Sequence, residues 1–78
     1  MRFHVTTHQA LRLSERDLSL ENVKNVVGYA DSSEYLSRGR HGGSLKKFRK
    51  TVDDKTLVVV AEVKREECRL ATAYYEES

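Results

Sequence analysis

The sequence feature that most restricts the fold is the apolar run Leu57-Val58-Val59-Val60-Ala61 within a predicted strand from Thr56 to Lys64. Successive strand residues point to opposite faces, so a run that is apolar at every position predicts a central strand covered on both faces. Two further predicted strands flank it, and three-residue links join all three. Links this short connect antiparallel neighbours, since a parallel crossover needs about a dozen residues or more. The flanking strands are Leu45 to Val52 and Cys68 to Tyr75, and the links are Asp53-Asp54-Lys55 and Arg65-Glu66-Glu67.

The first half of the chain favours one short strand and two helices. Met1 to Thr6 alternates in polarity as a strand does. Thr6 and Gln9 have the spacing of a capping box, which predicts a helix that begins near Thr7. Ser19 is a typical N-cap for a second helix, in which apolar residues follow the helical period, and Gly28 is a candidate for an early end of that helix. These apolar residues are Leu20, Val23, Val26, Val27 and Ala30.

Together these segments predict an α+β fold, in which an N-terminal strand and two helices pack on one face of a 3-4 stranded antiparallel sheet. The 78 residues suffice for one domain, residues 1-78. Glu34 to Arg38 is a predicted short strand, and Gly39 to Ser44 is a predicted flexible loop. The second face of the central strand needs a cover of its own, for which a second copy of the chain is one candidate.

Composition excludes several classes of protein. Cys68 is the only cysteine, so neither an internal disulfide nor a thiolate zinc cluster is possible, and His4, His8 and His41 lack metal-ligand spacing. We therefore expect no cofactor and no metal. No apolar segment approaches the length of about 20 residues that spans a bilayer, and none follows the N-terminal positive charge as in a secretion signal. We expect a cytoplasmic protein without a membrane partner.

The N-terminal helix carries His8, Arg12 and Arg16 at steps of four residues, which aligns them as one cationic stripe. Ala10, Leu11, Ser14 and Leu18 share the opposite side, and Leu13 lies between the two sides. The positive end of the helix dipole disfavours a charge on His8 and so favours the neutral form that a general base needs. Both arginines offer forked donors to a phosphate. The alternative is an ordinary solvated helix face.

A second candidate site is the segment from Tyr35 to Val52, which contains no acid. A basic surface of this kind is typical of proteins that track a phosphate backbone, whereas the alternative is a charged hairpin that discourages edge pairing of strands. Tyr74, near the end of the last strand, can stack on a base or donate a proton, but most strand tyrosines serve packing. The cationic candidates in the basic segment are Arg38, Arg40, His41, Lys46, Lys47, Arg49 and Lys50.

The order His8, Arg12, Arg16 followed by Asp17-Leu18-Ser19 resembles the opening of a small bacterial family catalogued as domain of unknown function 4258. The resemblance continues through Leu57 to Val63 and Thr72-Ala73-Tyr74. It implies a fold similar to that of RelE-like and barnase-type toxin ribonucleases. These act on RNA without a metal, with the 2′-hydroxyl as nucleophile and cationic groups that stabilise the charged phosphorane.

Two hypotheses follow. In the first, the protein is a toxin-like, metal-independent ribonuclease or RNA-acting protein, in which His8 exchanges protons, Arg12 and Arg16 hold the scissile phosphate, and Tyr74 assists. Its expected partners are RNA and a cognate antitoxin. In the second, the protein is a non-catalytic module that binds nucleic acid or a protein, including a second copy of itself. The first predicts that His8→Ala abolishes cleavage, and the second predicts salt-sensitive binding that His8→Ala leaves unchanged.

Overall fold

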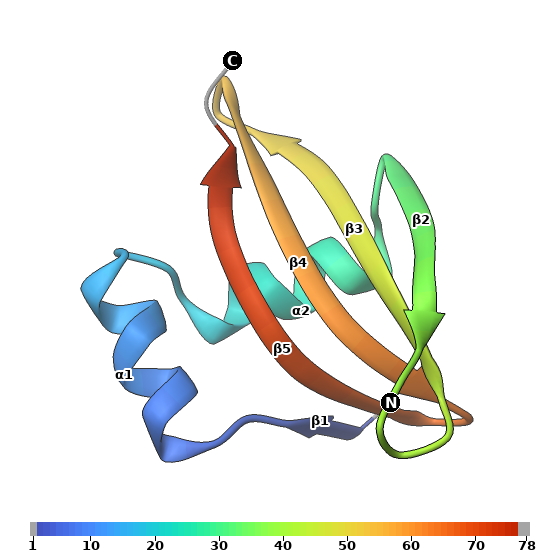
Figure 1. The fold of residues 1–78 in the computed structure, drawn as a ribbon. Helices are drawn as coiled ribbons and strands as arrows, with labels where there is room; N and C mark the ends of the chain where they lie inside the picture. Colours follow the sequence, from blue (N-terminus) through green and yellow to red (C-terminus); the bar gives the residue numbers. More distant parts are fainter. Residues whose placement is uncertain (1, 77–78) are drawn as a thin grey trace.

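The computed structural model describes residues 2–76, which form an α+β fold of one sheet and two helices (Figure 1). The fold class is therefore as predicted, and the four strands after the helices agree with the predicted ranges to within about two residues at each end. Met1, the first residue of the predicted N-terminal strand, lies outside the described residues. In chain order the elements are β1 (Arg2–His4), α1 (Thr7–Glu15), α2 (Leu20–Gly28), β2 (Ser32–Arg38), β3 (Ser44–Val52), β4 (Lys55–Lys64) and β5 (Glu67–Glu76).

The sheet has five strands in the order β1-β5-β4-β3-β2. Strands β2 to β5 form an antiparallel meander in which β4, with its apolar run, is central. β1 instead runs parallel to β5, from the pair Arg2 and Glu67 to the pair His4 and Arg69. The prediction of a 3-4 stranded antiparallel sheet is therefore wrong in strand number and in the direction of one edge strand. The two helices between β1 and β2 form the long connection that carries the chain from one edge of the sheet to the other.

α2 lies across one face of the sheet, and Figure 1 shows it behind the central strands. Val23 and Val26 of this helix are fully buried in a core that includes Phe48, Leu57 and Val59. Burying a valine or leucine side chain contributes about 1.5–3 kcal/mol, so this layer supplies most of the apolar burial. The helices thus cover one face of β4 as expected.

The opposite face of β4 is covered by the chain itself at its centre. Val58 points to that face and is 0% exposed. Its partners across the neighbouring strands are Arg49 and Tyr74, whose long side chains flank it on the same face. A second subunit is therefore not required to bury this valine.

α1 begins and ends with the caps that its sequence specifies. The Thr6 hydroxyl accepts from the Gln9 backbone N–H, and the Gln9 side chain accepts from the Thr6 N–H, which completes the predicted capping box. At its C-terminus, Leu18 N–H donates to Leu13 O at 2.8 Å across Asp17, whose φ is 57°. This is the Schellman arrangement with an aspartate in the left-handed position that glycine usually occupies.

The buried side of α1 differs from the prediction. Leu13 is its buried residue, whereas Leu11, expected on the apolar side, is 59% exposed. The helix is turned so that Leu13 points inward, flanked by Gln9 and Arg16, which lie one turn before and nearly one turn after it. Neither helix within residues 2–76 has the length and apolarity needed to cross a bilayer.

Candidate functional site

Among the described residues 2–76, no strand lies on the outer side of the C-terminal part of β5, because β1 pairs only with residues 67–69. α1 lies along this edge instead (Figure 1). The Gln9 side-chain amide donates to Leu70 O, and Arg16 Nη1 donates to Ala73 O at 2.8 Å. Carbonyl groups at an open sheet edge would otherwise need water or another chain as partner. The side chains of Gln9 in α1 and of Arg16, its C-cap residue, therefore replace a neighbouring strand.

β5 also contains a bulge where α1 meets it. Val60 pairs with Thr72, and the adjacent Ala61 pairs with Leu70, which leaves Ala71 as an extra residue. A bulge bends the strand and changes the direction of the side chains on either side of it. This bulge lies at the junction of two cavities.

The smaller cavity, of about 210 Å³, lies between α1 and the bulged part of β5. His8, Arg12 and Arg16 all line it, so the structure brings the three residues of the predicted stripe together. They are not equivalent, however. Arg16 donates to a backbone carbonyl of β5 and approaches Thr72 Oγ1 at 3.4 Å, so its guanidinium has a structural role.

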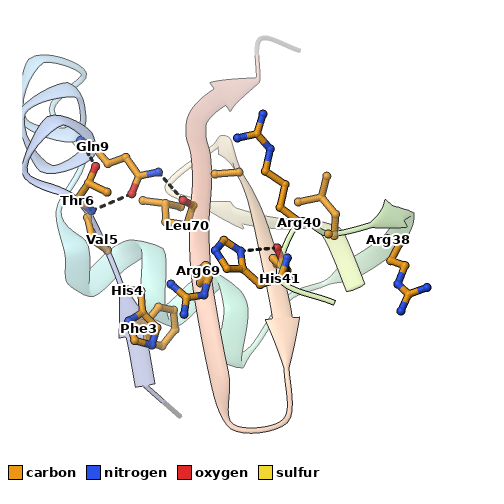
Figure 2. Close-up of a pocket in the computed structure, with 14 residues that line it drawn as sticks. Phe3, His4, Val5, Thr6, Gln9, Arg38, Arg40, His41, Arg69 and Leu70 are labelled. Atoms are coloured by element: carbon orange, nitrogen blue, oxygen red, sulfur yellow. Dashed lines mark hydrogen bonds and ion pairs between the residues drawn. The ribbon is translucent and has the colours of Figure 1, made fainter. Parts of the chain in front are cut away.

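The larger cavity, of about 940 Å³, lies between β1, the loop that joins β2 to β3, and the face of the sheet opposite α2 (Figure 2). Cationic and imidazole side chains surround it, whereas the one acid among its lining residues, Glu62, is buried and hydrogen bonded. Such a lining attracts anions. The cationic and imidazole residues are His4, Arg38, Arg40, His41 and Arg69.

The two cavities are contiguous, because Thr6, Gln9, Leu70 and Ala71 line both of them. We take the two adjoining cavities together as one surface, which extends from the β2–β3 loop past the bulge to α1. We call it the cationic groove and define it by Arg38, Arg40, His41 and Arg69 in the larger cavity and His8, Arg12 and Arg16 in the smaller one. The groove therefore joins the N-terminal stripe to the first part of the predicted basic segment.

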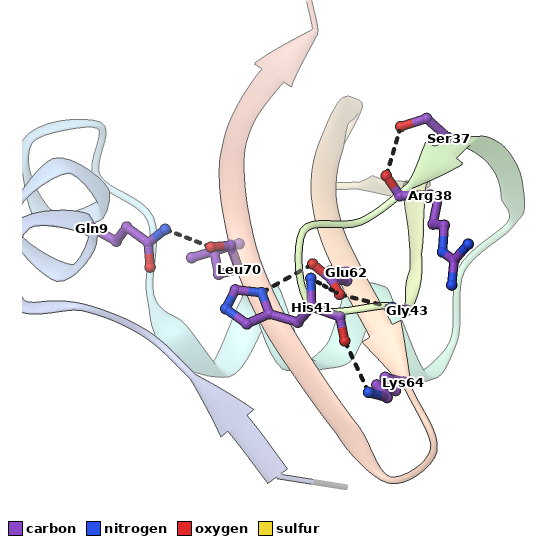
Figure 3. A network of polar contacts seen from close by, with 8 residues as sticks. All are labelled: Gln9, Ser37, Arg38, His41, Gly43, Glu62, Lys64 and Leu70. Atoms are coloured by element: carbon purple, nitrogen blue, oxygen red, sulfur yellow. Dashed lines mark hydrogen bonds and ion pairs between the residues drawn. The ribbon is translucent and has the colours of Figure 1, made fainter.

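The β2–β3 loop is fixed by one buried carboxylate (Figure 3). Glu62 is only 7% exposed, and its Oε2 accepts from the backbone N–H groups of His41 and Gly43, each at 2.9 Å. Its Oε1 lies 3.2 Å from Nδ1 of the His41 ring. The loop that was predicted to be flexible is therefore tied to β4 at three points.

The hydrogen bonds of Glu62 outweigh its burial in setting the charge of the carboxyl group. Burial alone would raise the pKa of Glu62, but the Gly43 N–H, the His41 ring and the His41 N–H together hold the pKa below its ordinary value. Glycine permits this contact, because a Cβ at Gly39 would collide with the Glu62 carboxyl group. A Cβ at Gly43 would lie 2.7 Å from Val63 O. The carboxylate is thus ionised and enclosed by the loop.

A second histidine–carboxylate pair lies at the outer edge of the same cavity. His4 Nε2 is 3.1 Å from Glu67 Oε1, and the two side chains are 39% and 42% exposed. An exposed pair of this kind contributes little to stability. It resembles the His41–Glu62 pair in composition but differs from it in burial.

The remaining cations of the predicted basic segment lie outside the cationic groove. The strand register places Lys46 and Lys50 on the face that carries the helices, and Lys50 Nζ donates to Tyr29 O at 3.0 Å. Lys47 and Arg49 lie on the opposite face, where Arg49 Nε is 3.3 Å from Glu76 Oε2.

Tyr74 is on that same face beside Val58, and it lines neither of the two cavities that form the groove. The sequence hypothesis groups Tyr74 with the N-terminal stripe because a tyrosine can stack on a base or donate a proton. The sheet register separates it from His8.

Sequence reasoning missed three residues of the site. Arg69 is one base among the many acids of the C-terminal segment, and only the pairing of β1 with β5 places it in the groove. Gln9 was read only as a capping residue. Glu62 gave one usable signal, since an acid that follows an apolar run in a central strand must find a buried partner.

Within residues 2–76, no three His, Cys, Asp or Glu side chains gather as metal ligands would. No family model matches the sequence, and no curated protein or solved structure matches it.

Proposed function

We propose that the protein binds single-stranded RNA along the cationic groove and cleaves it by proton transfer. One observation carries the proposal: two contiguous cavities unite the N-terminal stripe with the cations of the β2–β3 loop and with Arg69. A continuous series of cations suits a ligand with repeated negative charges better than a ligand with one charge. We also propose that the protein acts in the cytoplasm, where RNA is available.

Contacts between these cations and the phosphate backbone of the RNA would supply most of the affinity. Arg12, Arg40 and Arg69 line the groove on both sides of the bulge and offer charged donors to successive phosphates. Contacts of this type set position and affinity without reading sequence. We therefore expect binding that depends strongly on salt and weakly on base composition.

His8 is the proton-exchanging group that the N-terminal motif suggests. It is exposed at the second position of α1 and lines the smaller cavity beside Arg12. Resemblance to toxin ribonucleases supports RNA as substrate, because the 2′-hydroxyl can attack the adjacent phosphorus when a base removes its proton. Arg16 orders the β5 edge and holds α1 in place, and Tyr74 has no role in this proposal.

Binding is tested by fluorescence anisotropy with a labelled single-stranded RNA at several salt concentrations. Arg40→Gln and Arg69→Gln are expected to weaken binding and to lower the slope of log K against log salt by about 0.7 each. Lys55→Gln is the matched control, since Lys55 lies at the β3–β4 turn, at the opposite end of β4 from the loop. Equal losses of RNA affinity in all three variants, or an affinity that does not change with salt concentration, would refute the groove as the binding site.

Cleavage is tested with end-labelled RNA in the presence of EDTA, with DNA of the same sequence as control. The RNA is expected to be cut and the DNA to be bound but left intact, since DNA lacks the nucleophile. His8→Ala should slow cleavage by about 10²–10⁴-fold, the usual contribution of general acid–base catalysis. RNA that is bound but stays intact would leave a non-catalytic nucleic-acid-binding module.

A further inference from the structure

The His41 ring is the imidazole of the groove whose orientation the structure fixes. Its Nδ1 lies 3.2 Å from Oε1 of Glu62, and its own backbone N–H is bound to the other oxygen of the same carboxylate. Lys64 Nζ donates to the His41 carbonyl oxygen at 2.9 Å. The residue is therefore held by both its backbone and its side chain, although it belongs to a loop.

The carboxylate also selects one tautomer of the ring. An ionised carboxylate can only accept hydrogen bonds, so Nδ1 of the neutral ring must carry the proton that Oε1 accepts. Nε2 is then left with a free lone pair. Figure 3 shows this second nitrogen turned away from Glu62, and His41 lines the larger cavity of the groove.

We infer that His41 is the general base of the cleavage reaction and that Glu62 is its positioning residue; this inference rests on the proposed function. A base held by a buried carboxylate, with its free nitrogen in a cavity lined by Arg40 and Arg69, has the arrangement that removes a proton from a substrate hydroxyl. The sequence had suggested only a phosphate contact for His41.

His41 Nε2 takes the proton from the ribose 2′-hydroxyl while the 2′-oxygen forms a bond to the adjacent phosphorus. The bond from phosphorus to the 5′-oxygen breaks, and the departing oxygen takes a proton from protonated His8 on the other side of the bulge, where the negative charge of the bound phosphate offsets the positive end of the α1 dipole. The products are a 2′,3′-cyclic phosphate and a free 5′-hydroxyl, and exchange with water restores both imidazoles.

The two histidines then control opposite limbs of the pH–rate profile, because the base must begin without its proton and the acid with it. Several charged groups face His41 from the elements around it. From the loop and β2 these are Arg40 and Arg38, from β4 Glu62 and Lys64, from β5 Glu67 and Arg69, and from β1 His4.

The experiment measures the rate of cleavage of a short end-labelled RNA between pH 4 and 9 in wild type and four variants. His41→Gln keeps a donor for Glu62 and cannot accept the proton, so we expect a loss of about 10²-fold or more and no rise of the rate at the acid end. His41→Ala should lose activity likewise and regain part of it when free imidazole is added.

Glu62→Gln tests the positioning role. A side-chain amide donates to the ring and so favours the tautomer with its proton on Nε2, which should lower the rate by about tenfold or more. Lys55→Gln is the control, because Lys55 lies outside the groove, at the opposite end of β4 from the loop that carries His41. It should cleave as wild type does.

The outcomes separate the two proposals. If wild type cleaves RNA and His41→Gln cleaves it equally well, His41 is not the base, although the proposed function stands. An equal loss in Lys55→Gln, or failure of imidazole to restore any activity to His41→Ala, would also overturn the inference. If wild type binds RNA and leaves it intact, the proposed cleavage fails, and the assignment of His41 fails with it.

Discussion

Replacing Arg16 should lower stability, whereas replacing His8 or Arg12 should not, although the three residues form one stripe in the sequence. Arg16 Nη1 donates to Ala73 O at 2.8 Å on the otherwise open edge of β5. A hydrogen bond from a charged group contributes about 1.5–3 kcal/mol, and the low end applies because Arg16 is exposed to water. Arg16→Ala should therefore lower the free energy of unfolding by about 1.5 kcal/mol. For a domain of this size that loss corresponds to about 6–12 °C in melting temperature.

Urea and thermal unfolding followed by far-UV circular dichroism would measure this effect. His8→Ala and Arg12→Ala are the matched controls, and each should stay within about 0.5 kcal/mol of wild type, as surface substitutions usually do. The affinity for RNA should respond in the opposite order and fall more in Arg12→Ala than in Arg16→Ala. It is measured at a temperature below the melting range of both variants. If Arg16→Ala is as stable as wild type and binds RNA as poorly as Arg12→Ala, the assignment of Arg16 to the sheet edge is wrong.

Three further predictions concern the loop and the end of α1. Asp17→Gly should raise the free energy of unfolding by about 1 kcal/mol in urea titrations, because the φ of 57° carries a penalty for a residue with a Cβ; a lower value would contradict this. Gly39→Ala should displace the Glu62 carboxyl group and cost about 1–3 kcal/mol, with loss of hydrogen-exchange protection at Gly43; unchanged protection would refute the close contact. Because the folded pKa of Glu62 is lowered, its contribution to stability is present above the ordinary glutamate pKa and is lost as pH falls through the folded value. The Gly43 amide resonance should titrate with a midpoint below that of an unfolded glutamate, and Glu62→Gln should remove this transition.

Local chemistry made the helix ends and the meander predictable. A capping box depends on residues three apart, and a hairpin depends on a short link between two strands, so both are visible in sequence. The pairing of β1 with β5 is different, because it joins segments about sixty residues apart through only three residues of strand. Nothing in a stretch as short as Arg2–His4 indicates its partner, so neither the fifth strand nor the position of Arg69 could be derived.

The rotation of α1 about its own axis also could not be predicted from the sequence. Leu11 and Leu13 are equally apolar, and a helix of nine residues gives too few positions to decide which of them faces inward. The edge of β5 decides it, since Gln9 and Arg16 reach its carbonyl groups only when Leu13 points toward the core. A polar interaction with a distant strand therefore outweighed the local apolar pattern.

The contact of Gln9 and Arg16 with the edge of β5 links the stability of the fold to the shape of the groove. β1 covers only residues 67–69 of β5, and an uncovered remainder would be an edge open to pairing with another chain. α1 protects that edge with Gln9 and Arg16, and the same placement brings His8 and Arg12 next to the cavity that holds Arg69 and His41. A helix that protected the edge through apolar contacts alone would leave its cations facing solvent. Because polar side chains make the contact, the cationic side of α1 borders the sheet edge, and the stripe becomes one wall of a groove.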